Sequence, residues 1–113
     1  MGAVARSLAA AAAAAVVGLA GCSRPAAPPA PKTYQVAIAQ MAFGPTPSGL
    51  RAGDAVEWVN NDILQHSATA RDGSFDVDLP PGAHARTVLK APGAVSFYCK
   101  YHPGMTGTLV VAS

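Results

Sequence analysis

The chain has 113 residues, of which 50% are hydrophobic and 12% are charged, and its formal net charge is +2. A chain of this length has room for one folded domain. Arg6 and Arg24 account for the positive excess, so charge is balanced beyond residue 31, and the composition does not indicate a nucleic-acid-binding protein.

The N-terminal segment has the pattern of an export signal. Arg6 is followed by an uncharged run of Leu, Ala, Val and Gly over residues 8–19, which is shorter than the roughly 20 apolar residues that cross a bilayer. The run ends in Leu19-Ala20-Gly21-Cys22, which resembles the lipobox of bacterial lipoprotein signal peptides. That resemblance implies a signal peptide over residues 1–21 and a lipidated Cys22 that anchors the chain to a membrane. The alternative is an ordinary secretory signal followed by an incidental cysteine.

A proline-rich segment follows. Residues 22–31 are too poor in large side chains to bury a core, and they are predicted to form an extended tether. At about 3.1 Å per residue, polyproline II geometry gives this tether a reach of roughly 25–30 Å. The folded domain is predicted to cover residues 32–113.

Short runs with period-two alternation, separated by turn residues, dominate the domain, and none has a convincing helical period. Breaks are expected at residues 51–54, 80–82 and 91–93, where Gly and Pro gather. Strands are predicted over residues 34–38, 56–60, 67–70, 85–89, 95–99 and 106–111. This spacing predicts an all-β sandwich or barrel.

Alternation also predicts where two chemically important side chains point. Cys99 is in phase with Val95 and Phe97, the residues expected to face the core. His66 is in phase with Ala68 and Ala70. A thiol and an imidazole from distant parts of the sequence are therefore expected at one edge of the apolar interior.

Metal-binding side chains recur close to Cys99. His102 and Met105 follow it at successive spacings of three, and His66 supplies a second imidazole. A thiolate, two imidazoles and a weak thioether form the ligand set of a copper electron-transfer site. If Cys22 carries lipid, Cys99 has no disulfide partner in an oxidising compartment, and a bound metal would protect it. The structural alternatives are that Cys99 is a small buried hydrophobe, that His66 is a hydrogen-bonded polar residue near a loop, and that Met105 fills the core.

The domain resembles the cupredoxins, the small blue copper proteins with a Greek-key β-sandwich, and most closely the plastocyanin and amicyanin branch. The resemblance extends over nearly all of residues 32–113 and rests on the segments 52–60, 73–76, 81–82 and 98–107, together with Asp62 and His66. It implies one copper ion cycling between Cu(I) and Cu(II). His66, Cys99 and His102 would be the strong ligands and Met105 the distant axial ligand.

Two residues next to the expected ligands differ from what the site would use, and a third histidine is expected outside it. Family members often have asparagine after the first histidine, and its side chain bridges the two ligand-bearing loops; here Ser67 has a shorter reach. Pro103 has no N–H and cannot donate a hydrogen bond to the cysteine sulfur. His84 follows Pro81-Gly82 and is expected in solvent, outside any metal site.

The expected function is a membrane-tethered one-electron carrier, exported to the cell envelope, that meets a redox donor and a redox acceptor protein as a monomer. The family resemblance implies that His102 is the port for electrons and that the docking patch includes Phe43, Leu64, Pro103 and Gly104. A copper carrier or chaperone would use the same ligands and is the alternative. No enzymatic activity is expected, because a domain of this size has no room for a second copper centre.

Overall fold

The computed structural model describes residues 2–4 and 29–113, and every regular element in that part of the chain is a strand. Most of the predicted signal peptide, Cys22 and most of the predicted tether lie outside the described residues. No helix within the described ranges is long and apolar enough to cross a membrane. The strands are β1 (Thr33–Ala39), β2 (Ala42–Phe43), β3 (Leu50–Arg51), β4 (Ala55–Asn60), β5 (His66–Ala70), β6 (Asp76–Leu79), β7 (His84–Val88), β8 (Gly93–Tyr98) and β9 (Thr106–Ala112).

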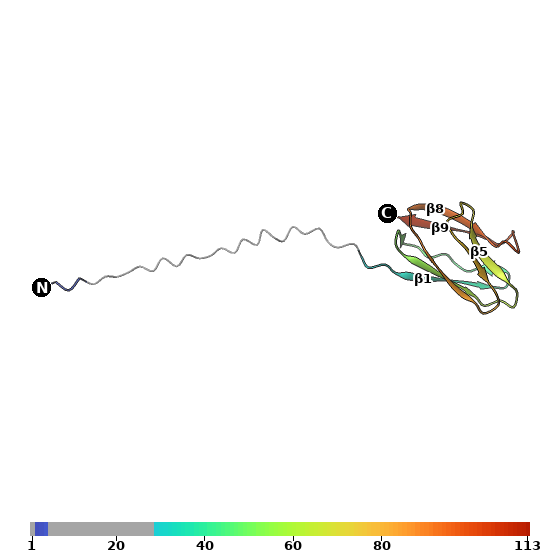
Figure 1. Cartoon of the computed structure of the whole chain (residues 1–113), viewed down its shortest axis with the longest axis horizontal. Helices are drawn as coiled ribbons and strands as arrows, with labels where there is room; N and C mark the ends of the chain where they lie inside the picture. Colours follow the sequence, from blue (N-terminus) through green and yellow to red (C-terminus); the bar gives the residue numbers. More distant parts are fainter. Residues whose placement is uncertain (1, 5–28) are drawn as a thin grey trace.

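The strands form two sheets that pack as a sandwich (Figure 1). One sheet has the order β2-β1-β4-β7 and the other has the order β3-β9-β8-β5-β6. β1 runs parallel to β4, whereas β8 pairs with β5 and β9 in antiparallel register. The expected all-β Greek-key sandwich is confirmed.

Each predicted strand is present, with small differences at its ends. Three strands were not predicted. β2 and β3 have two residues each, too few to show a period, and β6 is an edge strand of four residues, the shortest run in which alternation can be recognised.

Large apolar side chains from both sheets fill the space between them. Trp58 from β4 and Phe97 from β8 are fully buried, with ring centroids 5.0 Å apart and the rings tilted by 66°. Ile38 and Leu109 add fully buried side chains from β1 and β9. Edge-to-face packing of these rings fixes β8 against the opposite sheet, and β8 leads directly into Cys99.

A buried amide shapes the segment that leads to His66. The Asn60 side-chain nitrogen donates to the carbonyl oxygens of Leu64 and Leu79, both at 2.8 Å, and Asn60 Oδ1 accepts from the Asp62 N–H at 2.8 Å. Each of these bonds satisfies a polar group that would be costly to bury unpaired. Together they hold the loop between β4 and β5 in one conformation.

The chain enters the domain at one end of the sandwich, and the proposed metal-binding residues lie at the other. At one end, the Asp54 carboxylate accepts from the backbone N–H groups of Lys32 and Arg51, each at 2.9 Å, where β1 begins. At the other end, the Met41 N–H donates to Asp62 Oδ2 at 3.1 Å. Figure 1 places the turn between β8 and β9 at the end away from the start of β1. The residues proposed to bind metal thus lie far from the point where the chain enters the domain.

Candidate metal centre

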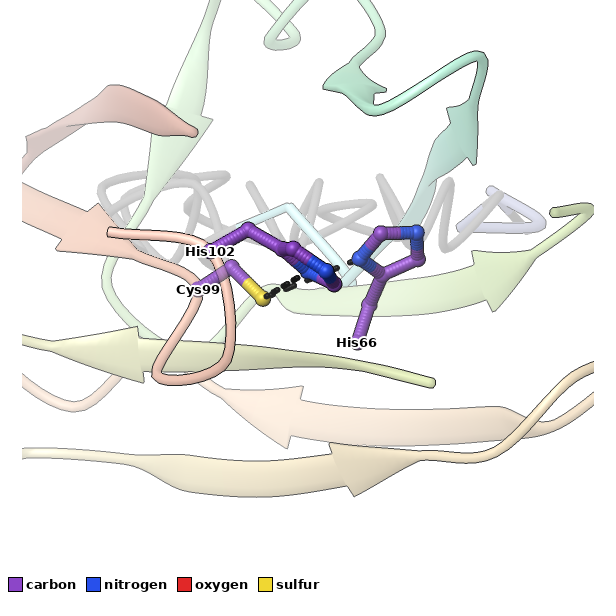
Figure 2. Close-up of side chains that lie close together, drawn as sticks. All are labelled: His66, Cys99 and His102. Carbon is purple, nitrogen blue, oxygen red and sulfur yellow. Dashed lines mark hydrogen bonds between the residues drawn. The ribbon is translucent and has the colours of Figure 1, made fainter. Parts of the chain in front are cut away.

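Three side chains from two separate segments meet at that far end. His66 is the first residue of β5, Cys99 directly follows β8, and His102 lies in the turn between β8 and β9. One ligand atom from each lies within 4.8 Å of the other two. His66 and Cys99 are fully buried and His102 is half-buried. Figure 2 shows both imidazole rings next to the Cys99 sulfur. The inward orientation inferred from alternation is confirmed for both His66 and Cys99.

The spacing of these atoms suits a metal ion. Cys99 Sγ lies 3.7 Å from His66 Nδ1 and 3.7 Å from His102 Nδ1. Bonds of about 2.3 Å to a thiolate and about 2.0 Å to an imidazole, as measured for zinc, put sulfur and nitrogen about 3.7 Å apart when they meet at about 120°. A thiol proton can point at only one nitrogen, so two equal distances are better explained by a site for an ion between the three atoms.

The environment of Cys99 favours the thiolate that a soft metal requires. Burial opposes ionisation of the thiol, but hydrogen bonding from His66, the backbone amide of Ser67 and His102 outweighs it, and the pKa of Cys99 falls to about 6. The sulfur is therefore largely ionised at neutral pH, and a metal would not have to displace a proton from it.

Asp62 fixes the protonation of His66. Its Oδ2 lies 2.9 Å from His66 Nε2 and also accepts the Met41 N–H. A carboxylate can only accept, so Nε2 carries a proton, and Nδ1 is the nitrogen that faces Cys99. Burial lowers the pKa of His66, but the hydrogen bonds with Asp62 and Cys99 more than offset it, so the net shift is upward. The His66 hydrogen bond is in turn the main cause of the lowered pKa of Asp62.

Asp62 is a functional residue whose role the sequence argument missed. The available signal was that Asp62 lies four positions before His66, and this spacing indicates a contact only weakly when the two residues are not in a helix. The contact depends on the Asn60 bonds that shape this loop, and on the turn at Gln40 and Met41. Both of these turn residues have the left-handed φ values, 51° and 60°, that bring the Met41 N–H to the carboxylate.

Ser67 makes the link that its short side chain put in question. Its Oγ accepts the Lys100 N–H at 2.8 Å and lies 3.0 Å from Thr69 Oγ1. The hydroxyl therefore joins the His66 segment to the residue directly after Cys99. A serine suffices here because β5 and the Cys99 segment lie close enough for its shorter reach.

Met105 closes the turn that carries Cys99 and His102. Its N–H donates to the His102 carbonyl at 2.9 Å, and its carbonyl accepts the Cys99 N–H at 3.1 Å. The side chain is buried, with 6% of its surface exposed, and belongs to the hydrophobic core. These backbone bonds keep Met105 in the same turn as Cys99 and His102, and its assignment as a fourth ligand stays a prediction.

The remaining expected residues fall outside the cluster. His84 is exposed, and its Nδ1 lies 3.6 Å from Glu57 Oε1, so its expected place in solvent is confirmed. Phe43 differs from expectation: it is half-buried and packs edge-on against Phe97, with centroids 4.8 Å apart, so it contributes less to the surface than predicted. Leu64, Pro103 and Gly104 are exposed as expected, and Ile63, which was not predicted, is 86% exposed.

Comparison with known sequences identifies relatives over most of the chain. Residues 11–111 match a family described as a cupredoxin-like domain. The chain is 34% identical over 118 residues to amicyanin-alpha of Methylorubrum extorquens, with 98% of this chain and 99% of that protein covered. It is 30% identical over 103 residues to a plastocyanin of Nostoc punctiforme, with 71% and 74% covered.

Solved structures support the same fold. A reduced Cu(I) form of an amicyanin variant superposes with a TM-score of 0.62 at 22% identity, covering 70% of this chain and 81% of that one. A purple cupredoxin from Nitrosopumilus maritimus superposes with a TM-score of 0.57 at 20% identity, covering 70% and 99%.

Proposed function

The chain belongs to the cupredoxin-like family, and from that premise we propose that it is a membrane-tethered blue copper protein that carries single electrons between redox proteins of the cell envelope. One copper ion is the cofactor. His66, Cys99 and His102 are its strong ligands and Met105 is its weak axial ligand. The observation that carries the proposal is the meeting of one thiol and two imidazole nitrogens within 4.8 Å at a largely buried end of the sandwich.

The donor set fits copper chemically. A soft thiolate with two imidazoles and a weak thioether is typical of blue copper sites. When bound, copper supplies a one-electron couple between its Cu(I) and Cu(II) states. The chain's own contribution is rigidity: Asp62 keeps the proton of His66 on Nε2, and the Lys100 N–H bond to Ser67 holds the two ligand-bearing segments together. Ligands held in this way change position little between oxidation states.

The surface near His102 supports docking of a redox partner. Ile63 and Leu64 are 86% and 44% exposed just before His66, and Pro103 and Gly104 are exposed just after His102. Such an apolar rim allows close approach of another protein without the cost of desolvating charges. The half-buried His102 ring is then the shortest route between the buried sulfur and a partner. No catalysis is involved, because electron passage requires no substrate, acid or base.

Export and membrane attachment rest on the sequence of residues 1–31. The signal-like run, the lipobox-like Leu19-Ala20-Gly21-Cys22 and the proline-rich segment support a lipid anchor with a tether. Lys32, where the tether ends, is bonded to Asp54 at the end of the sandwich away from the ligand cluster. The docking surface would therefore face away from the membrane, toward partners in the envelope.

The test is copper loading of the purified whole chain in detergent. Addition of Cu(II) should give an intense blue colour and a reversible one-electron wave in voltammetry. Cys99→Ala should abolish both, whereas His84→Ala, which removes an exposed imidazole outside the cluster, should change neither. A colourless complex, or a colour retained by Cys99→Ala, contradicts the proposal. Rapid transfer of copper to an acceptor protein without any electron exchange would instead identify a copper carrier.

A further inference from the structure

The two residues that flank His66 both reach the short segment between Cys99 and His102. Ser67 Oγ accepts the Lys100 N–H at 2.8 Å, and Gln65 Nε2 donates to the Tyr101 hydroxyl at 3.2 Å. Lys100 and Tyr101 are the two residues that separate Cys99 from His102. The His66 segment and the Cys99–His102 segment are thus joined on both sides of His66.

The side chains of Lys100 and Tyr101 continue to β6. Lys100 Nζ lies 3.1 Å from a carboxylate oxygen of Asp76 and 3.1 Å from Asp78 Oδ1. The Tyr101 hydroxyl donates to Asp78 Oδ1 at 2.9 Å. We call Gln65, Asp76, Asp78, Lys100 and Tyr101 the loop clamp.

The sheet places the acids of the clamp. In the pairing of β5 with β6, Ser67 is opposite Asp78 and Thr69 is opposite Asp76. The acids therefore share a face with these two hydroxyls, of which Ser67 Oγ accepts the Lys100 N–H. Thr69 Oγ1 donates to Asp76 Oδ1 at 2.9 Å, which fixes that carboxylate below the lysine. Strand register therefore aims both acids at the segment between two metal-binding residues.

The rest of the turn is bonded to itself. Cys99, His102 and Met105 exchange three backbone hydrogen bonds, from Cys99 N–H to Met105, from His102 N–H to Cys99 and from Met105 N–H to His102. These bonds keep the turn compact, but they do not set its distance from His66. Among the described residues, the Ser67 bond and the loop clamp are the hydrogen bonds that join residues 100 and 101 to other parts of the fold.

The clamp is a network rather than an isolated surface pair. Lys100 is 34% exposed, and Asp76 and Asp78 are 51% and 54% exposed, so each ion pair alone would be weak. Here one ammonium, two carboxylates, a phenol and an amide share partners, and the phenol contact carries no net charge of its own. Networks of this kind hold geometry better than single exposed pairs do.

We propose that Lys100 and Tyr101 are positioning residues whose contacts with Asp76, Asp78 and Gln65 hold Cys99 and His102 at the required separation from His66. The inference rests on the proposed copper function, but whether these contacts hold the turn in place can be tested without copper. Loss of the clamp lets the turn move relative to β5. The copper-free turn then opens more often, copper binds less tightly, and the ligands shift more between oxidation states.

The experiment compares two substitutions that remove charges of opposite sign with a third that leaves the charge unchanged. Lys100→Met removes a positive charge, Asp78→Asn removes a negative charge, and Tyr101→Phe removes only a hydroxyl. The whole chain is used, and three quantities are measured: amide hydrogen exchange of residues 99–105 without copper, Cu(I) affinity by competition with a chelator, and the reduction potential of the copper-loaded chain. Positioning predicts that all three variants exchange faster and bind Cu(I) more weakly, by about tenfold, the lower end of the range for residues that support metal ligands.

The reduction potential separates positioning from simple electrostatics. If Lys100 and Asp78 acted only as charges, Lys100→Met would lower the potential, Asp78→Asn would raise it, and Tyr101→Phe would leave it unchanged. Changes of the same sign in affinity and exchange for all three variants support the clamp. The proposal is overturned if hydrogen exchange and Cu(I) affinity are unchanged in all three variants and the reduction potential falls in Lys100→Met, rises in Asp78→Asn and stays the same in Tyr101→Phe.

Matched controls come from elsewhere in the domain. Lys90→Met and Tyr34→Phe make the same chemical changes outside the clamp and should leave exchange of residues 99–105 and Cu(I) affinity as in the unmodified chain. Lys100→Arg keeps the charge and reach to both acids and should restore most of the affinity. Failure of the unmodified chain to form a blue site would contradict the proposed function, whereas the copper-free exchange result would still decide whether the clamp holds the turn.

Discussion

Replacement of Gly107 by alanine should destabilise the domain sharply. Gly107 lies opposite Phe97 in the pairing of β8 with β9. A methyl group added at Gly107 would lie 2.3 Å from Cζ of the Phe97 ring, far inside van der Waals contact. Phe97 is fully buried, with Phe43 and Trp58 rings centred 4.8 Å and 5.0 Å away, so its ring has little room to move.

Overpacking of a core typically costs about 1–3 kcal/mol, and the closeness of this contact places Gly107→Ala near the upper value. In a domain of this size, each kcal/mol shifts the melting temperature by about 4–8 °C, so we expect a loss of about 12–24 °C. Because Phe97 lies two residues before Cys99, displacement of its ring should also disturb the site. The assay is thermal unfolding of the copper-free chain, which avoids the stabilisation that a bound ion would add.

Gly104 provides the matched control. A Cβ at Gly104 meets no atom within 4 Å, so Gly104→Ala should change stability by no more than about 0.5 kcal/mol. Adding Phe97→Leu to Gly107→Ala removes the clashing ring, and the double variant should lose less stability than the sum of the two single losses. A Gly107→Ala protein that melts within about 3 °C of the unmodified chain would refute this account of the core.

Two further perturbations test the site and the opposite end of the sandwich. Asp62→Ala removes the acceptor of His66 Nε2 and should weaken Cu(I) binding about 10–100-fold in chelator competition, and unchanged affinity would show that Asp62 does not orient the ring. Asp54→Asn tests pH dependence: the Lys32 and Arg51 amides hold the pKa of Asp54 below its usual range. Its ionised form therefore stabilises the fold above the unfolded pKa of about 3.9, and this contribution is lost as the pH falls through the lower folded value. The difference in urea midpoint between Asp54→Asn and the unmodified chain should narrow from pH 7 toward strong acid, and a constant difference would contradict the assignment.

Much of the site could be predicted from the sequence because the placement of its residues depends on patterns within short segments. Alternation along β8 turned Cys99 toward the core, and the short spacings placed His102 and Met105 in the same turn. The same reasoning put His66 in phase with Ala68 and Ala70, although the predicted strand began one residue later than β5 does. Strand periodicity and ligand chemistry were therefore sufficient to predict which side chains meet.

What was missed depends on contacts between segments distant in sequence. The role of Asp62 requires the loop conformation set by Asn60, and the loop clamp requires the register of β6 against β5. Phe43 was expected on the surface from the family resemblance alone, and its two-residue strand has no period that would indicate burial, yet it packs against Phe97. Such features follow from tertiary packing, which no single segment of the sequence specifies.

X-ray absorption at the copper edge tests the central claim most directly. The copper-loaded chain should show one ion per chain with one short sulfur and two nitrogen neighbours, and reversible one-electron reduction should leave this set in place. Cys99→Ala should lose the short sulfur signal, and His66→Ala or His102→Ala should each lose one nitrogen. A copper site without a short sulfur neighbour, or one that Cys99→Ala leaves unchanged, would contradict the assignment of a blue copper centre to His66, Cys99 and His102.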